Sequence, residues 1–255
     1  NFAPDHLDVH ADLDAYEAAK ARIWEAIEEP ADAVANLSDP VVRSHAPEGA
    51  TGFGTGAAAC RVEDGHLLLG EHRIVAVDEM PRRMPHDLLN AQAATALATR
   101  AGALPEGCAD VLRCFRGLPH RMQLLGEVDG IRFVDDSKAT TPHATVSAVN
   151  ALPGAVLIAG GRNKGLDLTP LGGSAPRAVV AIGEAADEVV AAFIGRCPVV
   201  LADSMESAVA QARREVQGGG VVLLSPGCSS FDWYSSYAER GDDFARVVRE
   251  LEQAR

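Results

Sequence analysis

The 255-residue sequence lacks the features that mark membrane proteins and secreted disulfide-bonded proteins. No apolar run is long enough to span a bilayer, and no charged stretch leads into a signal-like apolar segment. The five cysteines are odd in number and contain no C-x-x-C pair, so we expect scattered reduced thiols. Internal repeats and low-complexity segments are also missing. These absences predict a globular, cytoplasmic protein.

The usual phosphate-binding loops are missing as well. No Walker loop of the pattern G-x-x-x-x-G-K-[ST] occurs, because the glycine-rich run at 52–56 lacks the lysine. Gly160-Gly161 does not belong to a complete G-x-G-x-x-G pattern. A dinucleotide-binding dehydrogenase is therefore only a minor candidate.

Positive charge is scarce in the chain. Lys and Arg number 23 against 36 Asp and Glu, which gives a formal net charge of −13. An acidic surface repels phosphate backbones, so we expect neither nucleic acid nor an anionic membrane as a general partner. Hydrophobic residues make up 47% of the chain, which is enough for one large core or two medium ones.

The sequence pattern of residues 1–116 predicts helices mixed with short strands. A helix is expected at 12–28, because Asp12 can serve as its N-cap and apolar residues recur on one face. Those apolar residues are Tyr16, Ile23, Trp24 and Ile27. Strand-like runs follow at 33–37, 57–62, 66–69 and 73–77. A second helix is expected at 87–100, with Gly102 at its C-terminal end.

A change of pattern near Arg116-Gly117 predicts a boundary between a domain at 1–116 and another at 117–255. Beyond it, β-branched apolar runs alternate with helical stretches. The runs lie at 131–134, 155–159, 178–182, 199–201 and 221–224, and the helices at 142–151, 184–194, 204–216 and 238–253. This alternation is typical of the α/β class, with a parallel sheet covered on both faces.

Polar residues follow three of these strands at their carboxyl ends, where ligands collect in open α/β sheets. They are Asp135-Asp136-Ser137-Lys138, Gly160-Gly161-Arg162-Asn163-Lys164-Gly165 and Ser225-Pro226-Gly227-Cys228-Ser229-Ser230. Two lysines, acids and hydroxyls at one edge suit an anionic ligand with carboxylates or phosphates. Taken singly, each has a plainer explanation: a Gly-Gly turn, a solvated Lys164, or a surface ion pair between Asp136 and Lys138.

Lys20 and His6 are further candidates in the first part of the chain. Lys20 shares the apolar face of the helix at 12–28, so its stem could be buried while its amine reaches water. Alternatively, a partly buried lysine with a lowered pKa could form a carbamate, an oxygen ligand suited to Mg²⁺. His6 lies near Asp5 and Asp8 and is either a metal ligand or a loop residue.

Five blocks, in order along the chain, resemble the D-glutamate-adding branch of the Mur ligase family. They are Pro4-Asp5-His6-Leu7-Asp8-x-His10 with Ala18-Ala19-Lys20-x-Arg22-Ile23; His86-Asp87-x-x-Asn90-Ala91; Gly117-Leu118-Pro119-His120-Arg121; Asp136-Ser137-Lys138-Ala139-Thr140; and Leu224-Ser225-Pro226-Gly227-Cys228-Ser229-Ser230-Phe231-Asp232. The resemblance covers nearly the whole chain, and the third and fourth blocks are specific to that branch.

The resemblance implies an ATP-dependent ligase that joins D-glutamate to UDP-N-acetylmuramoyl-L-alanine through an acyl phosphate. It implies that 1–116 is the remainder of a P-loop-type central domain, with a mixed sheet and helices. Residues 117–255 would be a Rossmann-like C-terminal domain that binds the amino acid. Because the chain starts at Asn1 and lacks the Walker loop, we expect a truncated, inactive fragment. We also expect a monomer. The alternatives are a non-catalytic Rossmann-like binding module, and a sister Mur ligase or folylpolyglutamate synthase-type enzyme.

The resemblance also implies roles for individual residues. Lys20 matches a lysine that the family carbamylates, and His6 matches a Mg²⁺ ligand. The nucleotide contacts and the reaction centre would involve Asn90 at the adenine, Arg121 at the ATP phosphates, Asp136 at the ribose, and Lys138 beside the reacting groups. The D-glutamate contacts would be Thr140, Lys164, Ser230, Phe231 and Tyr237. A hinge near Arg116-Gly117 would bring Arg121 to ATP.

Three positions depart from the family pattern. Gln123 stands where an acid is expected, Thr141 where Asn is common, and Tyr237 where Phe also occurs. None of these changes removes a charge that the implied mechanism requires. They leave the preference for a particular substrate less well defined.

Substitution of Lys20 tests the implied carbamate. In an enzyme that contains this chain together with a phosphate-binding loop, Lys20→Ala should lose most ligase activity, because the lost carbamate supplied a carboxylate oxygen. Adding a short-chain carboxylic acid should restore part of the rate of amide formation. Near-normal activity without the additive would refute the carbamate.

Overall fold

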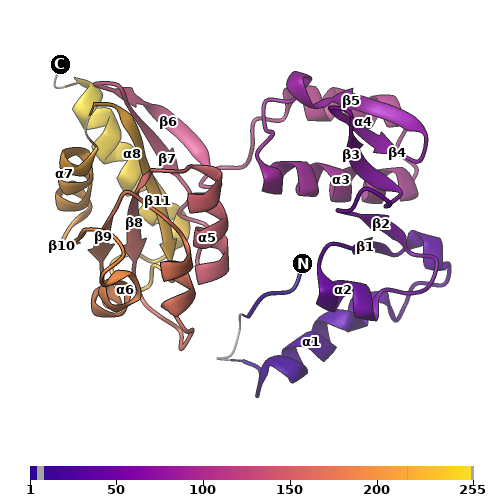
Figure 1. Ribbon diagram of the computed structural model, residues 1–255, viewed down its shortest axis with the longest axis horizontal. Helices are drawn as coiled ribbons and strands as arrows, with labels where there is room; N and C mark the ends of the chain where they lie inside the picture. Colours follow the sequence, from indigo (N-terminus) through magenta and orange to yellow (C-terminus); the bar gives the residue numbers. More distant parts are fainter. Residues whose placement is uncertain (5–8, 217, 254–255) are drawn as a thin grey trace. The chain divides into compact units, whose positions relative to one another are not determined.

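The computed structural model describes residues 1–4, 9–216 and 218–253, and it forms two compact units (Figure 1). Unit 1 is Asn1–Arg116 and unit 2 is Gly117–Arg255. The helices in the described ranges all fall short of the length and apolar character needed to cross a bilayer. The five cysteines are free thiols, as their spacing predicts.

Unit 1 contains a five-stranded sheet with helices packed against it. Its elements are α1 (Leu13–Ala21), η1 (Arg22–Trp24), η2 (Pro30–Asp32), β1 (Val34–Asn36), α2 (Pro40–His45), β2 (Thr51–Phe53), β3 (Cys60–Glu63), β4 (His66–Leu69), β5 (His72–Ala76), η3 (Val77–Glu79), α3 (Pro85–Arg100) and α4 (Pro105–Cys114). The strand order is β1-β2-β3-β4-β5. β1, β2 and β3 run parallel, and β4 is antiparallel to both β3 and β5.

The core of unit 1 lies between this mixed sheet and α3 and α4. α3 packs on β1, β2 and β3, and α4 packs on β5 and α3. Alanines on the inner side of α3, among them Ala91 and Ala96, let the helix approach the sheet closely. The sequence correctly predicts α3, because its small residues recur at helical spacing.

The helix expected at 12–28 is shorter than predicted. Asp12 does cap α1, with its side chain accepting from the Ala15 N–H at 2.8 Å. The α-helix ends at Ala21, however, and a 3₁₀ turn replaces its last part. Of the predicted apolar residues, Tyr16 is buried, Trp24 and Ile27 are half-buried, and Ile23 is 73% exposed.

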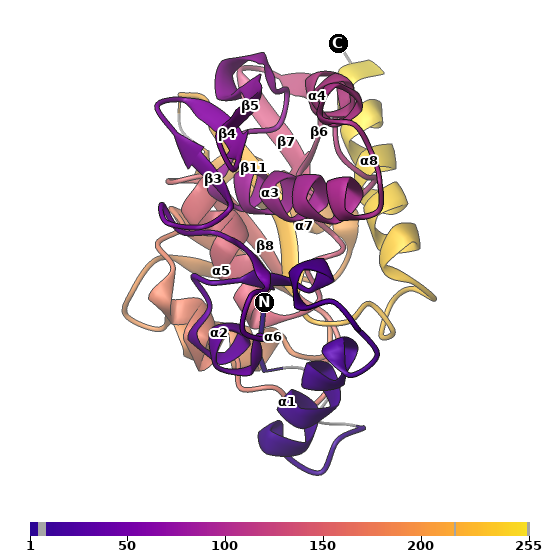
Figure 2. The same ribbon diagram turned by 90° about the vertical axis from the view of Figure 1, so that its right-hand side faces the viewer.

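Unit 2 contains a six-stranded sheet between two layers of helices (Figures 1 and 2). Its elements are β6 (Gln123–Val128), β7 (Ile131–Asp135), α5 (Pro142–Ala151), β8 (Val156–Gly160), η4 (Thr169–Gly173), β9 (Ala178–Ile182), α6 (Ala186–Phe193), β10 (Val199–Ala202), α7 (Met205–Glu215), β11 (Gly220–Gly227) and α8 (Tyr237–Gln253). α7 and α8 cover one face, and α5, α6 and η4 cover the other.

The sheet order of unit 2 is β10-β9-β8-β11-β7-β6. The five strands from β10 to β7 are parallel, which confirms the predicted α/β class. β8 and β9 are buried along their whole length, because helices cover both faces and leave no side that water can reach. The central side chains, including Ile158 and Leu224, form one core cluster with Phe244 of α8, whose ring lies 6.3 Å from that of Phe133.

β6 is antiparallel to β7 and was not predicted. The turn between them is Asp129-Gly130, with φ angles of 54° and 74°. Two successive left-handed residues of this type are the strongest short hairpin signal, so the sequence carried the information. The run at 123–128 was missed because its exposed Leu124 and central Gly126 obscure the strand pattern.

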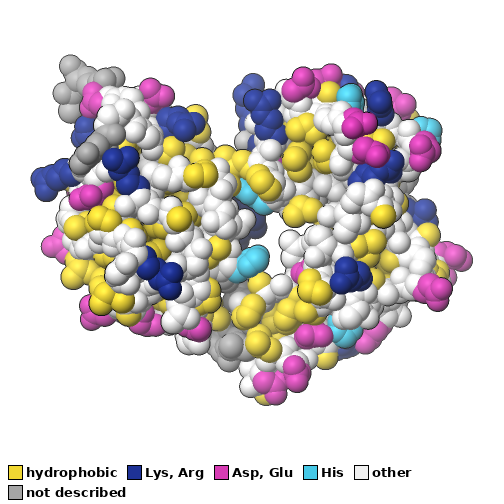
Figure 3. All heavy atoms as spheres, in the orientation of Figure 1, with side chains coloured by type: hydrophobic (Ala, Val, Ile, Leu, Met, Phe, Trp, Pro, Cys, Tyr) yellow, Lys and Arg dark blue, Asp and Glu magenta, His cyan; other side chains and the backbone are white. Residues whose placement is uncertain are grey.

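Charged side chains are spread over the surface rather than gathered by sign. On the face drawn in Figure 3, acidic side chains occur on both units and are interspersed with basic and hydrophobic ones. The overall net charge of −13 therefore does not form one acidic patch on that face. Local groups of cations can still attract an anion in such a surface.

Candidate functional site

Three loops meet at the carboxyl edge of the unit 2 sheet, because they follow the adjacent strands β7, β11 and β8. The loops after β8 and β11 are joined directly. Arg162 N–H donates to the Ser229 carbonyl at 2.9 Å, and Ser229 N–H donates back to the Arg162 carbonyl at 3.0 Å. Gly161 is required at this crossing, since a Cβ there would lie 2.2 Å from the Ser229 carbonyl oxygen. The edge is thus a built surface rather than three independent loops.

A buried arginine on α8 ties the loops after β7 and β11 together. Arg240 is 1% exposed. Its Nε donates to Ser137 Oγ at 3.0 Å, and an Nη donates to the Ser137 carbonyl at 2.9 Å. Both terminal nitrogens donate to the Cys228 carbonyl at 3.2 Å. Burial lowers the pKa of Arg240 to about 10, while Asp232 opposes that change, so the guanidinium stays charged at neutral pH.

Asp136 is buried at the start of the loop after β7. Its carboxylate accepts from Ser225 Oγ at 2.9 Å and from the Met122 N–H at 3.2 Å. Desolvation raises the pKa of Asp136 to about 7, although these two hydrogen bonds and the Arg121 charge favour the ionised form. Asp136 therefore changes charge near neutral pH, next to the segment that carries Arg121.

Two lysines of the site lie over aromatic rings from the loop after β11 and the start of α8. Lys138 Nζ is 4.0 Å from the centre of the Tyr237 ring, and Lys164 Nζ is 5.4 Å from that of Phe231. A ring face attracts an ammonium group and limits where it can go. The arrangement brings together two predicted pairs of site residues from different loops.

The remaining polar groups of the loop after β8 are already paired. Arg162 makes two hydrogen bonds with Glu184, at 2.9 and 2.8 Å, and Asn163 donates to Glu188 at 2.6 Å. These pairs hold the loop against the neighbouring α6 segment. Lys164 is exposed and is the cation of this loop with an aromatic partner.

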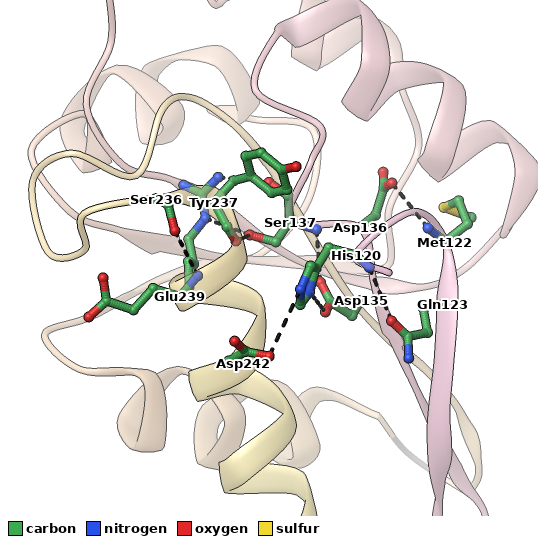
Figure 4. Close-up of polar contacts among 11 residues, drawn as sticks. His120, Met122, Gln123, Asp135, Asp136, Ser137, Ser236, Tyr237, Glu239 and Asp242 are labelled. Carbon is green, nitrogen blue, oxygen red and sulfur yellow. Dashed lines mark hydrogen bonds and ion pairs between the residues drawn. The ribbon is translucent and has the colours of Figure 1, made fainter. Parts of the chain in front are cut away.

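The segment 117–122, between the start of unit 2 and β6, carries Arg121 at the surface of unit 2. Figure 4 shows His120 between Asp135 and Asp242, with Met122 and Gln123 on the same turn. His120 Nδ1 lies 2.7 Å from Asp135 Oδ2, and its Nε2 lies 3.9 Å from Asp242 Oδ1. Arg121 itself is exposed. Of the remaining predicted residues of unit 2, Ser230 is buried in the loop after β11, and Thr140 is half-buried after β7.

Two of the site residues predicted in unit 1, Lys20 and Asn90, lie in the described part of the chain. Lys20 is exposed, with Nζ 5.1 Å from the centre of the Tyr16 ring, which agrees with the alternative in which its amine reaches water. It lines an apolar cavity of about 310 Å³ together with Glu17 and His45, which lie 2.6 Å apart. Asn90 is exposed on α3.

The described residues do not by themselves form the Mg²⁺ site that the resemblance implies. Within the described ranges, no group of three or more His, Cys, Asp or Glu side chains is placed to hold a metal ion. His6 lies outside the described residues. Lys20 alone, beside a tyrosine ring, does not form a metal site.

Sequence reasoning missed Arg240, and it did not predict the contact of His120 with Asp135 or that of Ser225 with Asp136. A signal for Arg240 existed, because it lies four residues before Phe244 and seven before Val247, on the apolar face of α8. A charged residue at such a position needs buried partners. Ser137 is 103 residues from Arg240 and Cys228 is 12 residues from it, and the sequence pattern alone does not name either as a partner.

Two family models match the chain. "Mur ligase middle domain" matches residues 1–98, and "Mur ligase, glutamate ligase domain" matches residues 120–228. The chain is 41% identical over 269 residues to a UDP-N-acetylmuramoylalanine–D-glutamate ligase of Frankia casuarinae, covering 99% of this chain and 57% of that protein. It is 38% identical over 270 residues to the ligase of the same name from Nitrosococcus oceani, covering 98% and 58%. The chain thus spans under two thirds of the length of these relatives.

Solved structures agree with the fold. A crystal structure of MurF from Acinetobacter baumannii superposes with a TM-score of 0.73 at 18% identity. The superposition covers 99% of this chain and 58% of that one. At this identity the likeness concerns the fold alone, and it extends through both units.

The pKa of Asp136 predicts a pH dependence of stability. Because the folded pKa of about 7 lies above the ordinary value of 3.8, the folded state holds a proton that the unfolded state has lost between these values. The contribution of Asp136 to stability is then full below about pH 4 and is lost as pH rises towards 7. Relative to that of Asp136→Asn, the free energy of unfolding of the wild type should fall by on the order of 1 kcal/mol per pH unit in that window. Urea unfolding at several pH values measures this, and a pH-independent difference would contradict it.

Proposed function

The chain belongs to the Mur ligase family, and from this premise we propose that it supplies the D-glutamate-binding part of an ATP-dependent ligase. The proposed reaction joins D-glutamate to UDP-N-acetylmuramoyl-L-alanine in peptidoglycan precursor synthesis. The relatives whose names support this reaction are matched over nearly the whole of the present chain. In this proposal unit 1 belongs to the ATP-binding central domain, and unit 2 is the C-terminal amino-acid-binding domain.

The observation that carries the proposal is the set of cations at one edge of the unit 2 sheet. Lys138 follows β7 and Lys164 follows β8, the two strands on either side of β11, and the Nζ of each lies over an aromatic ring. D-Glutamate brings two carboxylates, and two restrained cations suit such a ligand better than a single one. Thr140 and Ser230 add hydroxyl donors from the same loops.

The amino-acid contacts in this proposal are Thr140, Lys164, Ser230, Phe231 and Tyr237. Lys138 lies beside the reacting carboxyl and amine groups. ATP is a substrate, with Asn90 at its adenine, Asp136 at its ribose and Arg121 at its phosphates. His6 and a carbamylated Lys20 are proposed as the ligands that would hold Mg²⁺ in the intact enzyme.

Amide formation from a carboxylate needs activation, because hydroxide is a poor leaving group. The γ-phosphoryl of ATP passes to the L-alanyl carboxylate and forms an acyl phosphate. The uncharged amine of D-glutamate then attacks the acyl carbon, and phosphate leaves from the tetrahedral intermediate. Negative charge builds on phosphate and carboxylate oxygens, so fixed cations such as Arg121 and Lys138 lower the barrier. The restraint of Lys138 by Tyr237 reduces the reorganisation needed at that moment.

The setting of the reaction is also part of the proposal. A peptidoglycan precursor carried on UDP is made in the cytoplasm, and we propose that compartment for this chain. The acidic composition gives no reason to expect a nucleic-acid or membrane partner. We propose a monomer.

Amino-acid binding tests the proposal directly on the 255-residue chain. D-Glutamate should bind more tightly than L-glutamate, L-lysine or diaminopimelate in calorimetric titrations. Lys164→Ala should weaken D-glutamate binding by about tenfold, the loss of one charge-assisted contact. Arg177→Ala is the matched control. Arg177 is an exposed cation at the amino end of β9, whereas the proposed site lies at the carboxyl ends of the strands.

Two results would contradict the assignment. Tighter binding of L-lysine or diaminopimelate would point to a sister ligase that adds a different amino acid. Equal binding by the wild type and Lys164→Ala would remove the proposed carboxylate contact.

A further inference from the structure

The turn that carries Arg121 holds two residues in an unfavourable backbone conformation. His120 and Met122, on either side of Arg121, have φ angles of 59° and 45°. Each lies in the left-handed region, which costs a non-glycine residue about 1 kcal/mol or more. Such conformations persist where surrounding contacts leave no alternative, and they concentrate at functional sites.

Backbone and side-chain hydrogen bonds fix this turn from several directions. The His120 N–H donates to Gln123 Oε1 at 3.0 Å, and the Lys138 N–H donates to the His120 carbonyl at 3.1 Å. The Met122 N–H donates to Asp136 Oδ1 at 3.2 Å. Each residue next to Arg121 is therefore bonded to a different partner, and two of these partners belong to the loop after β7.

The imidazole of His120 is held separately. Its Nδ1 lies 2.7 Å from Oδ2 of Asp135, a carboxylate that is 0% exposed and also accepts the Ser137 N–H at 2.9 Å. This contact joins the ring to a buried carboxylate and holds the ring in one orientation. The two side chains lie against Gly241 of α8, where a Cβ would be 2.2 Å from Nδ1 and 2.7 Å from Asp135 Oδ2. The glycine leaves the space that the pair occupies.

We propose that Asp135, acting through His120, and Gln123 are positioning residues that hold Arg121 ready to bind a polyphosphate. The inference rests on the proposed function in which Arg121 binds the phosphates of ATP. A guanidinium on an already ordered turn loses less conformational freedom on binding than one on a mobile segment. The strain at His120 and Met122 is offset by the surrounding contacts and keeps the turn in one conformation.

This role also accounts for Gln123, which stands where the family pattern has an acid. The turn requires an oxygen acceptor for the His120 N–H, and the amide oxygen of glutamine supplies it. A negative charge is not needed for that hydrogen bond. The departure from the pattern therefore preserves the positioning contact.

A double-mutant cycle on the 255-residue chain tests the proposal, with inorganic tripolyphosphate as the probe. Arg121→Ala and Asp135→Asn should each weaken tripolyphosphate binding by about tenfold. The double variant should bind tripolyphosphate about tenfold more weakly than the wild type, as Arg121→Ala alone does. The reason is that a residue that acts only through Arg121 has no effect once Arg121 is gone. Arg132→Ala, which removes an exposed arginine of β7, should bind within about twofold of the wild type.

Further variants keep the test decisive if Asp135→Asn folds poorly. Gln123→Met removes the acceptor and should accelerate hydrogen exchange of the His120 amide at least about tenfold, whereas Gln123→Glu should restore the wild-type rate. Gly241→Ala crowds His120 and Asp135 without changing either, and it should weaken tripolyphosphate binding as Asp135→Asn does.

Three outcomes would overturn the proposal. They are multiplicative effects of Arg121→Ala and Asp135→Asn on tripolyphosphate binding; unchanged binding by Asp135→Asn together with unchanged exchange of the His120 amide in Gln123→Met; and wild-type binding no tighter than that of Arg121→Ala. Titration of the wild type with D-glutamate separates this inference from the proposed function. If the double-mutant cycle gives the predicted result but D-glutamate does not bind, the proposed substrate is wrong and the positioning role still holds.

Discussion

The buried guanidinium of Arg240 is the contact on which the unit 2 site depends. It comes from α8, yet it bonds the loop after β7 through Ser137 and the loop after β11 through Cys228. A buried charge is stable only when its donors are used, and here the donors meet a hydroxyl and two backbone carbonyls. Because the same side chain serves both loops, neither can move independently of the other. Tyr237, three residues before Arg240, is placed under Lys138 by the same helix start.

The sheet explains why these contacts can form at all. β8, β11 and β7 are neighbours, so residues far apart in sequence leave the sheet at one edge. Parallel strands with both faces covered bury the backbone and leave the carboxyl-end loops as the place where polar side chains can gather. The loops are then joined by the Arg162–Ser229 pairing, by Arg240 and by the Ser225–Asp136 bond. Packing of the core and construction of the site are parts of one arrangement.

Much of unit 2 could be predicted from its sequence, because each signal was local. The bounds of β9 and α5 agree with the predicted runs, and the polar ends of three strands indicated the edge of the sheet. The supporting contacts could not be predicted, since Arg240, Ser137 and Cys228 meet only after the chain has folded. In unit 1, helical periodicity placed Ile23 on the apolar face of a helix at 12–28, but α1 ends at Ala21 and Ile23 is exposed. A short helix end is decided by packing, which a periodic pattern does not report.

The most direct test of this account is D-glutamate affinity and folding stability in Arg240→Lys. Lysine keeps the charge but lacks the fork that reaches Ser137 and Cys228 together. The account predicts an intact fold in circular dichroism, a free energy of unfolding lower by about 3 kcal/mol, and D-glutamate binding weakened at least about tenfold. Affinity and stability equal to those of the wild type would show that the two loops hold their positions without Arg240 and would contradict the account.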